Sequence, residues 1–150
     1  MHDPGRWLAA QLVSLAIGRV LDVGCGAGRH LRDGDVGIDL DHARVRSARG
    51  RSRLVAVGDA HALPFADSTF GTALAIRMLN DAGGIDAVLT EIRRVLTADG
   101  RLLVYTRART AGGDRLDAGN GDARLRMHFG RVRVLADEQQ AGGVLFVAEC

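Results

Sequence analysis

The chain has few of the residues that mark several classes of protein. Its two cysteines, Cys25 and Cys150, are far apart and form no CxxC pair, so neither a zinc site nor a disulfide framework is expected, and a reducing, cytoplasmic setting is predicted. All 20 basic residues are arginine, and the chain has no lysine-bearing GxxxxGK[ST] phosphate loop. Aromatic residues make up 4% of the sequence, which gives little support for base stacking with a nucleic acid.

Long hydrophobic runs and blocks of one charge are also missing. The longest apolar run, residues 8–17, is interrupted by Gln11 and Ser14 and is too short to span a bilayer, so no membrane segment is predicted. The first five residues lack the positively charged region of a signal peptide. The 20 basic and 18 acidic residues give a net charge of +2 and alternate along the chain, which argues against a basic tail for binding nucleic acid.

Glycine, by contrast, is abundant. The 20 glycines among 150 residues are well above the usual ~7% and follow no period, so they predict tight turns and a loop where backbone approaches a ligand. With 47% hydrophobic and 25% charged residues, the composition is that of a globular protein, and residues 1–150 are the size of one domain.

Short apolar runs alternate with helical patterns along the chain. Strands are predicted at residues 19–23, 36–40, 53–57, 72–76, 101–105, 132–135 and 144–147. Helices are predicted at residues 5–18, 41–49 (with Asp41 as N-cap) and 84–97, and residues 106–130 form a loop with one short helical turn. This order predicts an α/β, doubly wound, mostly parallel sheet whose last two strands form an antiparallel hairpin.

The most specific motif is Gly24-x-Gly26-x-Gly28, directly after the first strand. Three alternate glycines let the backbone pass close to a ligand, although a tight turn without a ligand is the alternative. The nicotinamide dinucleotide motif GxGxxG has two residues before its third glycine, whereas here there is one, which argues against an NAD-dependent oxidoreductase.

Two carboxylates follow the next two strands. Asp39 ends the second strand, where it can accept hydrogen bonds from both hydroxyls of a ribose, with a helix cap as the alternative role. Asp59 follows the third strand and can accept from an adenine amino group, with a plain turn as the alternative. Residues 63–65, Leu-Pro-Phe, form either an apolar wall beside an adenine or part of the core. Together these groups predict a nucleoside ligand with few phosphates.

Four stretches together resemble the class I S-adenosylmethionine-dependent methyltransferases. They are VLDVGCGAGR at 20–29, GIDL at 37–40, GDA at 58–60 with LPF at 63–65, and LTEIRRVLTADGRLL at 89–103. The resemblance implies a seven-stranded Rossmann-like sheet, S-adenosylmethionine as cofactor and methylation as the activity.

The resemblance also implies roles for individual residues. Gly24, Gly26 and Gly28 would line the methionine part of the cofactor, and Asp22 would help to hold its amino-acid end. Asp39 would bind the ribose hydroxyls, Asp59 and Ala60 would meet the adenine, and Ile76 and Arg77 would border the methyl group and the acceptor. Cys25 and Leu40 complete the implied set of cofactor-binding residues. No metal is implied.

The sequence departs from the family pattern in several places, two of which are the segments on either side of the first strand. Only residues 29–38 separate Gly28 from Asp39, so the first crossover helix is expected to be about one turn long. The cap before the first strand is reduced to a single helix.

The methyl acceptor and any general base remain open. His30 and Asp81 are weak candidates for the base, and His61 and His128 are weaker. A small-molecule acceptor is favoured over a modified tRNA base. The alternative function is a module that binds S-adenosylmethionine without catalysis, or that needs a second copy or a helper subunit to complete its acceptor pocket.

Overall fold

The computed structural model describes residues 3–79, 82–107, 114, 116–137 and 143–150. The elements, in chain order, are α1 (Pro4–Leu15), β1 (Val20–Val23), β2 (Val36–Asp39), α2 (His42–Ala48), β3 (Val55–Val57), β4 (Phe70–Ile76), α3 (Ile85–Val95), β5 (Leu96–Arg107), α4 (Gly121–Arg126), β6 (Arg131–Asp137) and β7 (Gly143–Glu149). None of the helices in these ranges is long and apolar enough to cross a lipid bilayer.

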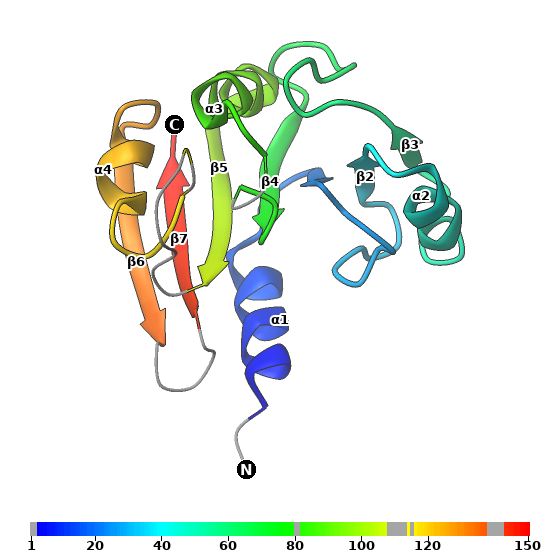
Figure 1. The fold of residues 1–150 in the computed structure, drawn as a ribbon, viewed down its shortest axis with the longest axis horizontal. Coiled ribbons are helices and arrows are strands. Elements are labelled where there is room, and N and C mark those ends of the chain that lie inside the picture. Colours follow the sequence, from blue (N-terminus) through cyan, green and yellow to red (C-terminus); the bar gives the residue numbers. More distant parts are fainter. Residues whose placement is uncertain (1–2, 80–81, 108–113, 115, 138–142) are drawn as a thin grey trace.

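All seven strands form one sheet in the order β3-β2-β1-β4-β5-β7-β6, which Figure 1 shows from β6 on the left to β3 on the right. Strands β1 to β5 are parallel, and β7 runs antiparallel to both β5 and β6. The predicted doubly wound sheet with a terminal hairpin is therefore confirmed. The predicted turn of that hairpin, residues 139–143, lies largely outside the described residues.

Helices cover both faces of the sheet. On one face α1 buries Leu8 and Leu12 against β1, β4, β5 and β7. On the other face α3 and α4 pack against the same sheet, and the apolar stripe predicted for the α3 region is completely buried. The alternation of side chains along each strand supplies both cores, because successive residues point to opposite faces.

The start of β5 differs from the sequence prediction. The sequence predicts a strand at residues 101–105, but β5 already begins at Leu96. Phe70 of β4 pairs with Leu96 and Thr72 with Arg101, so the extra residues of β5 form a bulge at this point of the ladder.

The connection from β1 to β2 contains no helix, so the expected single helical turn is wrong. Residues 26–30 form successive turns instead. Leu31 takes the place of a helix as the packing element, because it is buried together with Cys25 and with Val45 and Ala48 of α2. A connection of this length is close to the minimum for two parallel neighbours.

The Leu63–Phe65 segment is fastened to α3. Arg94 donates to the carbonyls of Leu63 and Phe65 at 2.9 and 2.8 Å, and the Glu91 carboxylate accepts from the Leu63 N–H at 2.8 Å. Leu63 is buried in the core and Phe65 packs against it. Of the two roles considered for this tripeptide, the structure therefore supports core packing.

Candidate functional site

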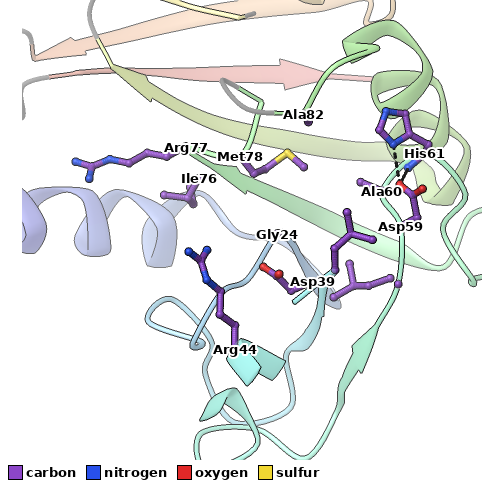
Figure 2. A pocket seen from close by; sticks show the side chains of 13 residues that line it. Gly24, Asp39, Arg44, Asp59, Ala60, His61, Ile76, Arg77, Met78 and Ala82 are labelled. Atoms are coloured by element: carbon purple, nitrogen blue, oxygen red, sulfur yellow. Dashed lines mark hydrogen bonds and ion pairs between the residues drawn. The ribbon is translucent and has the colours of Figure 1, made fainter. Parts of the chain in front are cut away.

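A cavity of about 390 Å³ lies at the carboxyl ends of β1, β2 and β4. It sits beside the point where the strand order reverses between β1 and β4, which is where open α/β sheets bind ligands. Its volume is within the range of small-molecule sites. The lining residues, most of them labelled in Figure 2, are Gly24, Ile38, Asp39, Leu40, Arg44, Gly58, Asp59, Ala60, His61, Ile76, Arg77, Met78 and Ala82.

The glycine turn contributes Gly24 to the pocket wall. Gly24, Gly26 and Gly28 all have positive φ, at 71°, 55° and 79°. The N–H groups of Gly24 and Cys25 both donate to the Ile38 carbonyl, which ties the turn to β2. A Cβ on Gly24 would lie 2.7 Å from the Cβ of Met78, so only glycine fits there.

Alanine substitutions at Gly24 and Gly26 should lower the stability of the protein by different amounts. Gly24→Ala combines a left-handed backbone with a contact that Met78 cannot avoid, so we expect the free energy of unfolding to fall by about 2–3 kcal/mol. Gly26→Ala meets nothing within 4 Å and should cost about 1 kcal/mol, from its positive φ alone. Urea unfolding measures both values, and equal losses would contradict this account.

Asp39 is held in the pocket by backbone donors. Its Oδ2 accepts from the Gly26 N–H at 2.8 Å and its Oδ1 from the Asp41 N–H at 2.9 Å. Each carboxylate oxygen has a second lone pair, so the group can still accept two further hydrogen bonds. Helix α2 is capped by Asp41, as predicted, whose carboxylate accepts from Ala43 and Arg44. The alternative role of Asp39 as that cap is therefore not observed.

Asp59 and His61 form a pair in the pocket wall, joined by the dashed line in Figure 2. Asp59 Oδ1 accepts from the His61 N–H at 2.9 Å and lies 2.7 Å from His61 Nδ1. These hydrogen bonds, first the one from the His61 backbone, lower the pKa of Asp59. The carboxylate is therefore ionised at neutral pH and able to accept from a ligand.

Ile76 and Arg77 line the pocket at the end of β4. Arg77 has a φ of +61°, which is unusual for a residue other than glycine. Its N–H donates to the Tyr105 carbonyl at 2.8 Å, and its guanidinium lies 5.6 Å from the centre of the Tyr105 ring. Such strain commonly occurs at functional sites.

Four predicted residues are not in the pocket wall: Asp22, Cys25, Gly26 and Gly28. Asp22 is 1% exposed, and among the described residues its Oδ2 has no hydrogen-bond partner. Burial, followed by the charges of Asp35 and Asp39, raises the pKa of Asp22 to about 8. Burial likewise raises the pKa of Cys25 to about 12, so its thiol is not reactive.

Of the candidate bases that the structure describes, His61 lines this pocket and the others do not. His30 lines a separate groove beside α1, and burial, then the charges of Arg29 and Arg77, lower its pKa. His128 lies 3.0 Å from Asp86, and Asp81 is outside the described residues.

Sequence reasoning missed some lining residues. Arg44, Met78 and Ala82 were not predicted, and His61 was weighed only as a base. The sequence indicates a place near the pocket for Arg44 and His61, because each lies within a few positions of an aspartate at a strand end. Met78 and Ala82 had none beyond their place after the fourth strand.

Comparison with known proteins gives a consistent set of similarities. The family model described as "Methyltransferase domain" matches residues 21–104, more than half of the chain. Sterol 4-C-methyltransferase strm-1 of Caenorhabditis elegans is 34% identical over 110 residues, covering 63% of this chain and 33% of that protein. The malonyl-[acyl-carrier protein] O-methyltransferase of Geobacter sulfurreducens is 37% identical over 95 residues, covering 55% and 36%.

Among solved structures, a possible histamine N-methyltransferase from Thermotoga maritima superimposes with a TM-score of 0.80. It is 19% identical and covers 97% of this chain and 91% of its own, so the likeness is one of fold. The present chain spans about a third of the length of the two curated relatives.

Proposed function

Because the chain belongs to the class I S-adenosylmethionine-dependent methyltransferase family, we propose that it transfers a methyl group from S-adenosylmethionine to a small-molecule acceptor. We further propose that residues 1–150 form one cofactor-binding domain. When bound, S-adenosylmethionine supplies a methyl group activated by its sulfonium centre.

The observation that carries this proposal is the hydrogen bonding of the Asp39 carboxylate. Two backbone N–H groups fix its carboxylate at the strand end and leave it capacity for two more donors, which suits the two hydroxyls of a ribose. Asp59, ionised in the same wall, suits the adenine amino group.

The residues around the proposed methyl position act mainly by alignment. Ile76 and Arg77 would border the acceptor, and holding two reactants in line contributes on the order of 7–11 kcal/mol. A base is needed only for a nucleophile whose proton has a high pKa. His61 is a poor candidate for that base, since both of its ring nitrogens already have partners.

The names of the relatives support a small-molecule acceptor. One is named for a sterol and one for a malonyl group on a carrier protein, and both are methyltransferases. The low aromatic content and the near-neutral charge favour such an acceptor over a modified tRNA base.

A second candidate function is a cofactor-binding module completed by another subunit. It is favoured by the helix-free β1–β2 connection, beside which a groove of about 140 Å³ lies between α1 and residues 29–32. A second copy or a helper subunit would cover this groove.

Calorimetry and turnover assays distinguish these functions. We expect S-adenosylmethionine and S-adenosylhomocysteine to bind, and labelled methyl to reach at least one member of a panel of sterol, fatty acid and malonyl thioester. Transfer to tRNA alone would contradict the small-molecule acceptor. Binding without transfer would favour the module. Binding of NADH in place of S-adenosylhomocysteine would contradict both.

A further inference from the structure

The ring of His61 connects two segments of the pocket wall. Its Nδ1 lies 2.7 Å from Asp59 Oδ1, and its Nε2 lies 2.6 Å from the carbonyl oxygen of Gly83, 22 positions further along the chain. Both partners are acceptors and neither can donate. A neutral imidazole has only one N–H and could satisfy one of them, whereas the imidazolium satisfies both.

We infer that His61 is a positioning residue for the cofactor site, which as an imidazolium joins Asp59 to the Gly83 backbone and holds this wall of the pocket in place. The inference rests on the proposed function, because it assumes that the pocket binds the cofactor. It extends that function by assigning a role to a residue that neither donates nor accepts the methyl group.

The segment that His61 holds is part of the pocket. Ala82, which precedes Gly83, is one of the lining residues. On the other side, the N–H groups of Gly84 and Ile85 donate to Asp114 Oδ2 at 3.0 and 3.3 Å. The turn at Gly83 and Gly84 is thus held from two directions, and His61 provides the attachment on the pocket side.

His61 also orients Asp59. Both the N–H and the Nδ1 of His61 are directed at Oδ1. Within the described ranges Asp59 Oδ2 has no partner, so this oxygen is available to a ligand. A wall that is already ordered binds more tightly, because less conformational entropy is lost on association.

This arrangement makes the cofactor affinity depend on pH. The hydrogen bond to Asp59, and then the one to Gly83, raise the pKa of His61 above its usual 6.5. The two-sided contact is therefore complete at low pH and is lost as the pH rises through this raised pKa. The wall then opens on the Gly83 side.

Other charged groups around the ring are distinguishable from His61. Within the described ranges they are Asp59 on its own loop, Asp114 behind the Gly84 turn, and Asp39, Arg44 and Arg77 on the other walls of the cavity. Aspartates ordinarily titrate near pH 4 and arginines above pH 12. Asp22, whose pKa is raised to about 8, titrates in wild type and in a His61 variant alike, so it cancels from their ratio.

The test compares wild type with His61→Asn, which cannot carry the charge or reach Gly83. The dissociation constant of S-adenosylhomocysteine is measured by calorimetry near pH 6 and near pH 9. A hydrogen bond to a charged donor corresponds to about tenfold in an equilibrium constant, so we expect the variant to bind roughly tenfold more weakly near pH 6. Near pH 9 the two proteins should agree within about twofold.

His128→Asn is the matched control, because His128 also pairs with an aspartate, Asp86, but lies outside the pocket. It should match wild type at both pH values. Nitrogen-15 spectra should show both ring nitrogens of His61 protonated near pH 6. A constant ratio between wild type and His61→Asn, or a singly protonated ring near pH 6, would overturn the inference and leave the cofactor site intact. Failure of wild type to bind at either pH would overturn the proposed function as well.

Discussion

Replacing Asp39 with alanine is expected to remove most of the thermal stabilisation of this protein by S-adenosylhomocysteine. Hydrogen bonds to a charged acceptor contribute roughly 1.5–3 kcal/mol each, so losing two ribose contacts weakens binding by about a hundredfold or more. A ligand at 100 times its dissociation constant stabilises by about 2.7 kcal/mol, which raises the Tm of a domain this size by about 5–10 °C. The same concentration should shift the Tm of Asp39→Ala by at most about 1–2 °C.

Asp41→Ala is the matched control for this experiment. Asp41 is the next carboxylate along the chain and caps α2, but it is not a lining residue. Its loss should cost about 1 kcal/mol of stability and leave the ligand-induced shift intact. A full shift in Asp39→Ala would contradict the ribose assignment.

Asp22→Asn is expected to stabilise the ligand-free protein, increasingly so at high pH. The pKa of Asp22 is about 8 in the folded protein and 3.8 in the unfolded chain. Between these pH values the folded state therefore holds a proton that the unfolded state has released. The contribution of Asp22 to the free energy of unfolding therefore falls as the pH rises from about 4 to about 8. Asparagine removes that loss, because it never carries the buried charge.

Urea unfolding near pH 5 and near pH 9 measures this effect. We expect the advantage of Asp22→Asn over wild type to grow by on the order of 3 kcal/mol between the two conditions. Asp33→Asn, an exposed site in the same connection, is the control and should show no such growth. An advantage that is the same at both pH values would contradict the assignment of a buried, protonatable carboxyl.

Local signals were sufficient for much of the fold. Asp41 precedes a helix and its side chain accepts from two N–H groups of the first turn, as an aspartate in that position commonly does. The stripe that begins at Ile85 repeats with the helical period, and it is buried against the sheet. Both features depend on residues within a few positions of each other, which is why the sequence alone predicts them.

Other features depended on contacts between distant segments. In the short β1–β2 connection Leu31 packs with Val45 and Ala48, a contact that no pattern within the connection reveals. Leu63 faces the core rather than the cavity because Glu91 and Arg94 hold its backbone. Features of this kind depend on which distant segments come into contact when the chain folds.

The sequence by itself determined the parallel sheet, the glycine turn after its first strand and the carboxylates that end the next two strands. These follow from the period of apolar residues and from the backbone freedom of glycine, both of which are local properties. Only the tertiary structure decided that Asp22 is sealed from water and that His61 meets the Gly83 carbonyl. Burial and contacts across 22 positions arise only when the chain folds back on itself, so no local pattern in the sequence reveals them.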